Sequence, residues 1–144
     1  MKISKKCQYA LKAVLELARL TPGEPRKTHD IADAQQISPR FTEIILNELK
    51  HGGFVESRRG NGGGYMLART PGDLTVREII EYIQGPISVA PEAGNKAFFG
   101  NETFKKLWHE VNSAISEVCE NKTFAELVKF ERAKRDKSAP NYII

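Results

Sequence analysis

The sequence predicts a mainly α-helical protein with a small β-hairpin wing, arranged as a winged helix-turn-helix domain followed by a long helix. Three observations predict this class. Apolar residues recur at intervals of three and four over several segments, which is typical of amphipathic helices. The second and third of these segments are separated by a tight turn. Two short strand candidates joined by a glycine-rich loop follow the third, which completes the element order of this fold.

The composition is that of a globular protein. The chain has 144 residues, of which 40% are apolar and 28% charged, enough for one domain with a core of its own. No apolar run approaches the roughly 20 residues that a membrane-spanning helix needs, so we expect no membrane partner. The basic N-terminus leads into an amphipathic pattern and does not predict a secretory signal. Two cysteines, Cys7 and Cys119, suit a reducing compartment, and we expect a cytoplasmic protein.

The first two helices are expected over residues 4–20 and 28–35. Ser4 is a suitable N-cap for the first helix, and the prolines and glycine of residues 21–25 end it. In the second helix, Ile31 and Ala34 are expected to face inward. The apolar stripe of the first helix consists of Ile3, Cys7, Ala10, Leu11, Val14, Leu17 and Ala18.

The third helix is expected to start with Ser38 as its N-cap and Pro39 at the first helical position, where the missing N–H of proline costs nothing. Gly52-Gly53 suits a left-handed cap at its C-terminal end. The sequence predicts two faces for this helix. The apolar face consists of Phe41, Ile44, Ile45 and Leu49, and the polar face of Arg40, Glu43, Asn47 and Lys50.

A hairpin and a fourth helix follow. The strands are expected over residues 54–58 and 65–68, joined by residues 59–64, whose glycines and asparagine can adopt the positive φ values of a hairpin loop. Thr75 and Glu78 form a capping box, with Leu74 and Ile79 placed as its hydrophobic staple. The helix that they start is expected to end at Gln84, before Gly85-Pro86.

The rest of the chain is expected to be a loop over residues 85–100 and a helical region over residues 101–144. A long helix begins at Asn101; a last helix of about ten residues follows a capping box of Thr123 and Glu126. The tail Lys137–Ile144 is expected to be extended. A small core cannot also cover the apolar stripe of the long helix, which therefore predicts a homodimer. The stripe consists of Phe104, Leu107, Trp108, Val111, Ile115 and Val118.

The net charge of +4 lies in the first part of the chain. Residues 1–60 carry eleven Lys and Arg against seven Asp and Glu, whereas residues 61–144 carry eleven of each kind. A local basic excess favours a polyanion as partner, nucleic acid first and an anionic membrane surface second. The other interpretation is an ordinary, slightly basic domain.

The third helix and the hairpin together indicate double-stranded DNA as the partner. Arg40 can donate two hydrogen bonds to guanine, and Glu43 can accept one from cytosine N4. Arg58 and Arg59 can bind phosphates or enter a minor groove. The alternatives are a merely solvated helix face with an ordinary hairpin loop, or a module or sensor that acts through a partner protein. The candidate DNA-binding residues are Thr28, Ser38, Pro39, Arg40, Phe41, Glu43, Asn47, Arg58, Arg59, Gly60, Asn61, Gly62, Gly63 and Tyr65.

The sequence does not predict an enzyme. His29, His51 and His109 are scattered, and neither a His-x-x-x-His or Cys-x-x-Cys pair nor a nucleophile elbow occurs. The glycine-rich loop is not followed by Gly-Lys-Ser/Thr and leads into a strand, which argues against a nucleotide-binding phosphate loop. We therefore expect no catalytic residue and no metal site.

Several segments resemble the Rrf2 family of bacterial winged-helix regulators, the IscR-, NsrR- and CymR-like group. They are residues 1–11, the helix start at 37–43, the Arg-Gly-x-x-Gly-Gly-Tyr wing within 58–69, residues 74–86 and residues 107–127. The resemblance covers nearly the whole chain and implies a homodimeric transcription factor, usually a repressor, that reads a palindromic site. It implies a DNA-binding domain over residues 1–84, an effector or cluster-type loop over 85–100 and a dimerisation region over 101–144. Asn101–Cys119 would be the dimerisation helix.

The chain departs from the cluster-binding members of this family, which carry three cysteines between the Gly-Pro and the long helix. Residues 86–103 contain neither cysteine nor histidine, the donors that an iron–sulfur cluster needs. The resemblance therefore implies the cluster-free branch, without a cofactor. Cys7, beside Lys5 and Lys6 in a first helical turn, could have a redox role as a thiolate, although a small core residue is the simpler interpretation; Cys119 is interpreted as a core or half-exposed residue. Residues 86–100, with Phe98 and Phe99, could bind a small-molecule or protein effector.

Overall fold

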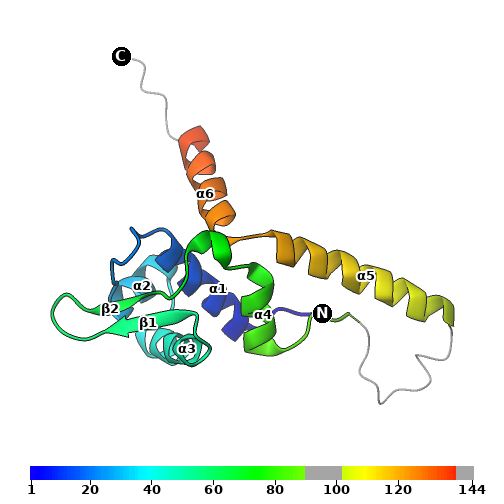
Figure 1. The fold of residues 1–144 in the computed structure, drawn as a ribbon, viewed down its shortest axis with the longest axis horizontal. Helices are drawn as coiled ribbons and strands as arrows, with labels where there is room; N and C mark the ends of the chain where they lie inside the picture. Colours follow the sequence, from blue (N-terminus) through cyan, green and yellow to red (C-terminus); the bar gives the residue numbers. More distant parts are fainter. Residues whose placement is uncertain (90–101, 139–144) are drawn as a thin grey trace.

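The computed structural model describes residues 1–89 and 102–138 and confirms the mainly helical fold with a two-stranded hairpin (Figure 1). Strands β1 and β2 pair antiparallel, with Val55 opposite Leu67 and Arg58 opposite Gly64. The elements in chain order are α1 (Lys5–Ala18), α2 (Thr28–Gln35), α3 (Pro39–His51), β1 (Val55–Arg58), β2 (Gly64–Leu67), a 3-10 turn (Pro71–Asp73), α4 (Val76–Gln84), α5 (Glu102–Asn121) and α6 (Phe124–Ser138).

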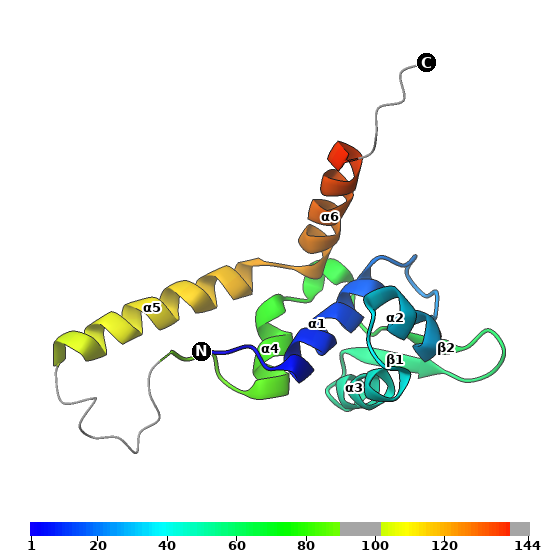
Figure 2. The same ribbon diagram turned by 180° about the vertical axis from the view of Figure 1, so that it is seen from behind.

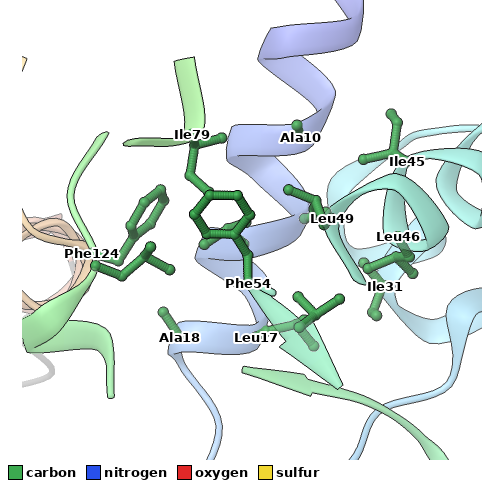
Figure 3. Close-up of a cluster of buried hydrophobic side chains, with 14 of the residues drawn as sticks. Ala10, Leu17, Ala18, Ile31, Ile45, Leu46, Leu49, Phe54, Ile79 and Phe124 are labelled. Carbon is green, nitrogen blue, oxygen red and sulfur yellow. The ribbon is translucent and has the colours of Figure 1, made fainter. Parts of the chain in front are cut away.

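Helix α1 lies at the centre of the hydrophobic core. Side chains of α2 and α3 pack on one side of it, and Ile79 of α4 and Phe124 of α6 on the other (Figure 3). Phe124 is completely buried, and burial of such a side chain contributes about 1.5–3 kcal/mol. Two backbone hydrogen bonds, from Val76 N to Lys122 O and from Phe124 N to Leu74 O, join the start of α6 to the start of α4. The start of α6 is therefore part of the winged-helix core.

The side-chain caps predicted for α1, α3 and α4 are confirmed. Ser4 Oγ accepts from Cys7 N at 3.1 Å, and Ser38 Oγ accepts from Phe41 N at 3.2 Å. Thr75 and Glu78 form the full capping box, in which Thr75 N donates to Glu78 Oε2 at 2.9 Å and Glu78 N donates to Thr75 Oγ1 at 3.3 Å. Burial opposes the charge of Glu78, but its hydrogen bonds with Thr75 and Arg69 outweigh that effect and lower its pKa.

Several predicted boundaries and inward positions are wrong. Helix α1 ends at Ala18, not at residue 20, and the strands begin and end within one residue of the prediction. In α2 the buried alanine is Ala32, and Ala34 is exposed. The left-handed cap predicted for Gly52-Gly53 is confirmed, because Gly53 has a φ of 78° and Gly52 before it still has a helical conformation.

Helix α6 is 15 residues long, not about ten, and continues through Lys137 to Ser138. Its sequence is rich in Glu, Lys, Arg and Ala, which are good helix formers, and Glu131 pairs with Arg19 of α1. For the last cap, Glu126 N donates to Thr123 Oγ1 at 3.2 Å, which is one half of the predicted capping box. The tail prediction for residues 139–144, and Asn101 as the first residue of the long helix, lie outside the described residues.

The hairpin loop and α5 lie at opposite ends of the molecule in both views (Figures 1 and 2). Helix α5 extends away from the winged-helix body and contacts it mainly through α4. The segment after α4 also bonds to α5, because Val89 N donates to Asn112 Oδ1 at 2.7 Å. Within residues 1–89 and 102–138, none of the helices has the length and apolar character needed to cross a membrane.

Candidate nucleic-acid interface

The polar face of α3 is exposed to solvent, with one correction to the predicted faces. Ser38, Pro39, Arg40, Glu43 and Asn47 are exposed, as expected. Ile44 was placed on the apolar face, but it is 51% exposed. The buried stripe instead consists of Thr42, Ile45, Leu46 and Leu49, with Phe41 half-buried and packed edge-on against Tyr9.

Thr42 explains how α3 is rotated relative to the prediction. Its hydroxyl donates to Ser38 O at 2.9 Å, so the buried side chain keeps a hydrogen bond and its methyl group can face the core. At 3.6 residues per turn, a stripe through residues 42, 45, 46 and 49 leaves Ile44 on the opposite side of the helix. Ile44 therefore lies on the same face as Arg40 and Asn47.

Three side chains of this face, those of Arg40, Glu43 and Asn47, have no partner among the described residues. Neither Arg40 nor Glu43 forms an ion pair or hydrogen bond there, and the Asn47 side chain forms none. Some charges elsewhere on the body are paired, such as Lys6 with Glu48 at 2.6 Å. The face is thus available to a ligand that offers hydrogen-bond donors and acceptors.

Lys50, the last residue of the predicted polar face, has a different role. Its Nζ donates to Ser57 Oγ at 2.7 Å, which joins the end of α3 to strand β1. This contact fixes the hairpin relative to α3. The free polar surface of the helix is therefore confined to its first three turns.

The hairpin loop presents two exposed arginines on a constrained backbone. Arg58, Arg59, Gly60, Asn61 and Gly62 are exposed, and neither arginine has a partner in the part of the chain described. Gly60 has a φ of 103°, which favours glycine. Gly63 is buried, and a Cβ there would collide with the carbonyl oxygen of Arg58. The turn therefore requires glycine at position 63.

Tyr65 and Thr28, both predicted to contact DNA, are half-buried. Tyr65 packs against the core, and its backbone exchanges two hydrogen bonds with Arg26, at 2.7 and 2.8 Å. These bonds attach the base of the wing to the segment that leads into α2. The structure thus gives Tyr65 a role in holding the wing in place.

Glu16 is the buried charged residue that sequence reasoning missed. It is 4% exposed, on the core side of α1. Its carboxylate accepts from Arg19 Nη1 at 2.7 Å and from Gln35 Nε2 at 2.8 Å, and lies 3.3 Å from Arg26 Nη2. Glu16 therefore connects α1, α2 and the segment that pairs with the wing. An acidic residue between Val14 and Leu17 on an apolar stripe was the available signal.

Arg19 extends this ion network to α6. Its guanidinium donates to both carboxylate oxygens of Glu131, with Nε–Oε2 and Nη2–Oε1 distances of 2.8 and 2.6 Å. Burial opposes the charge of Arg19, but the bonds to Glu131 and Glu16 outweigh it and raise the pKa. A single network of charges thus extends from α6 to the base of the wing.

Both cysteines lie in or against a second apolar cluster, formed by Cys7, Ile80 and Ile87. Cys7 is completely buried, and burial raises its pKa, so the alternative of a thiolate at the start of α1 is not favoured. Burial likewise raises the pKa of Cys119. These surroundings support the interpretation of Cys7 as a core residue.

The predicted stripe of α5 is only partly covered. Phe104, Leu107 and Val118 are 50%, 44% and 59% exposed, while Trp108, Val111 and Ile115 are half-buried. Val118 and Cys119 also line an open apolar groove between α1, α4 and the junction of α5 with α6. Its other lining residues are Leu11, Lys12, Leu15, Val76, Lys122, Phe124 and Leu127.

A metal site does not emerge from the described residues. No three His, Cys, Asp or Glu side chains in residues 1–89 and 102–138 come together in a way that could hold a metal ion. Residues 86–103 contain no cysteine or histidine. The donors present therefore do not fit an iron–sulfur cluster in that segment.

Comparisons with known proteins agree with this geometry. The family model described as "Rrf2: Iron-dependent Transcriptional regulator" matches residues 3–130. The HTH-type transcriptional regulator CymR of Bacillus subtilis is 29% identical over 136 residues, covering 94% of this chain and 96% of the relative. The HTH-type transcriptional regulator IscR of Citrobacter koseri is 29% identical over 130 residues, covering 89% of this chain and 80% of the relative.

Solved structures give the same result. The structure of CymR (YrzC), the global cysteine regulator of B. subtilis, superposes with a TM-score of 0.78 at 31% identity, covering 90% of this chain and 98% of that one. IscR of T. potens superposes with a TM-score of 0.76 at 30% identity, covering 99% and 95%. The chain thus matches transcriptional regulators over nearly its full length. It also has the fold, the exposed face of α3 and the arginine-bearing wing described above.

Proposed function

This chain belongs to the Rrf2 family of transcriptional regulators, and we propose that it is a cytoplasmic, sequence-specific repressor that binds a palindromic operator as a homodimer. The observation that carries the proposal is the unpartnered face of α3 beside a wing with two free arginines. Unpaired polar groups on a recognition helix and cations on a wing match the base edges and phosphates of duplex DNA.

In this mechanism α3 enters the major groove with its N-terminal half. Arg40 donates two hydrogen bonds to guanine, and Glu43 accepts from the amino group of cytosine. Arg58 and Arg59 bind phosphates or the adjacent minor groove, where the glycines of the turn let the backbone approach closely. Lys50 joins the end of α3 to strand β1, and the Glu16 network joins α1 and α2 to the Arg26 segment that pairs with the wing.

Homodimerisation is supported by the exposed apolar surface on and beside α5. The exposed residues of α5 and the open groove beside Val118 are surfaces that a second copy would remove from water. A twofold dimer presents two identical α3 helices and so reads a palindrome. We assign residues 1–84 to DNA binding and residues 101–144 to dimerisation, with residues 85–100 as the intervening effector loop. The start of α6 lies in the dimerisation region but also packs into the winged-helix core.

Repression follows from occupancy, because a dimer bound across a promoter excludes polymerase from it. The family is described as iron-dependent, but residues 86–103 of this chain contain no cysteine or histidine to hold an iron–sulfur cluster. We propose a regulator without a metal cofactor, whose effector is a small molecule or a protein.

Selection of bound genomic fragments by the full-length protein tests this function. We expect one palindromic sequence to be enriched, and affinity for it to fall with salt by about 0.9 log unit per log unit of salt for each phosphate contact. Sedimentation should give twice the chain mass of 16.2 kDa. Weak, sequence-blind binding would instead favour a protein-interaction module, and a stable monomer at micromolar concentration would refute the dimer.

A further inference from the structure

We infer that Ile44 is a specificity-determining residue that reads the C5-methyl group of a thymine in each half-site of the operator. The inference rests on the proposed function, because it requires α3 to lie in the major groove. It adds a base that Arg40 and Glu43 do not read.

The first argument is the position of Ile44. Its side chain is 51% exposed and lies opposite the buried stripe of α3. Arg40 precedes it by four residues and Asn47 follows it by three, so all three share one helix face. A major-groove contact by Arg40 or Asn47 would therefore also turn Ile44 toward the bases.

The second argument is that the packing of the body does not account for this exposed side chain. Scattered exposed apolar residues are ordinary on protein surfaces. The other large ones among the described residues either make a contact within the body or lie outside α3. Tyr82 donates its hydroxyl hydrogen to Glu48 O at 2.8 Å and packs on Phe54. Phe104, Leu107, Val118 and Phe130 lie on α5 and α6, and Met1 is the first residue of the chain. Ile44 alone among them lies between unpartnered polar residues on α3.

The third argument is chemical. Thymine is the base that presents a methyl group in the major groove, and an apolar side chain is its natural partner there. A β-branched residue in a helix strongly prefers one χ1 rotamer, so the methyl groups of Ile44 have a preferred direction before DNA binds. Arg40 and Glu43 suit guanine and cytosine, and the amide of Asn47 suits adenine, so Ile44 is the residue of this face that suits the methyl group of thymine.

The test uses synthetic duplexes of the selected operator in which each thymine in turn is replaced by deoxyuridine, which pairs identically but lacks the methyl group. For the wild-type protein we expect one position per half-site where the replacement weakens binding about fourfold, the effect of burying one methyl group. Ile44→Ala should bind thymine and deoxyuridine equally at that position. Ile44→Val, which keeps the β-branched methyl groups, should discriminate as the wild type does.

The outcomes separate the inference from the proposed function. Failure to enrich any sequence would refute the proposed function itself. Specific operator binding in which every thymine replacement is neutral, or in which Ile44→Ala still discriminates at the same position, would overturn the role of Ile44 and leave the DNA-binding function standing. Circular dichroism melting should show that Ile44→Ala folds, because the residue is exposed and alanine favours helix.

Discussion

Replacing Glu16 with alanine tests the buried charge network. The change leaves Gln35 Nε2 and the Arg26 guanidinium without their carboxylate, although Arg19 keeps Glu131. Removing one partner of a buried ion pair costs about 3–5 kcal/mol. The Arg26 and Arg19 side chains are 33% and 24% exposed, so water recovers part of that cost. We therefore expect Glu16→Ala to lower the free energy of unfolding by about 2–3 kcal/mol.

Urea unfolding and thermal melting of the full-length protein measure this loss. For a chain of this size the expected decrease in Tm is about 6–12 °C. Glu16→Gln keeps the shape and one acceptor and should lose less than Glu16→Ala. Glu131→Ala is the matched control, because it removes a half-exposed partner of the same arginine and should cost no more than about 1 kcal/mol. A loss for Glu16→Ala no larger than that of the control would refute the reasoning.

Four further predictions concern DNA binding and metal content. Glu43→Ala should relax base preference without weakening overall affinity, because a carboxylate in the groove acts mainly by rejecting wrong bases. Arg59→Ala should weaken binding to all duplexes by about 1–3 kcal/mol and reduce the salt slope by about one contact. Binding isotherms on operator and scrambled duplexes at two salt concentrations measure the effects of both variants. Unchanged specificity for Glu43→Ala would contradict the assignment of this face of α3 to DNA. Gly63→Ala should abolish tight DNA binding while the core stays folded, because its Cβ would displace the Arg58 carbonyl; a variant with native affinity would show that the turn adapts. Anaerobically purified protein should contain no stoichiometric iron or sulfide, and their presence would contradict the cofactor-free assignment.

Local features of this protein were predictable because their causes lie within a few residues. Ser38 and Pro39 start α3, and Thr75 with Glu78 starts α4, through hydrogen bonds over three residues. The glycines of residues 60–64 allow a hairpin turn whatever surrounds it. Charged side chains were expected at the surface, and the structure exposes those of Arg40, Glu43, Arg58 and Arg59.

The features that were mispredicted depend on contacts between segments distant in the sequence. Helix α3 has more apolar residues than the neighbouring helices can cover. Periodicity alone therefore could not predict that Thr42 is buried and Ile44 exposed. The hydrogen bond of Thr42 to Ser38 allowed that polar residue to enter the core in its place. In the same way, Tyr65 serves the base of the wing because its backbone pairs with Arg26.

Residue types at short spacing encode the element order, the helix caps, the glycine-rich wing and the resemblance to one regulator family. The outward position of Ile44, and the gathering of Arg19, Arg26 and Gln35 around the buried carboxylate of Glu16, depend instead on tertiary packing. Burial and charge pairing of this kind depend on which helix faces meet, and that is settled by packing the whole core at once.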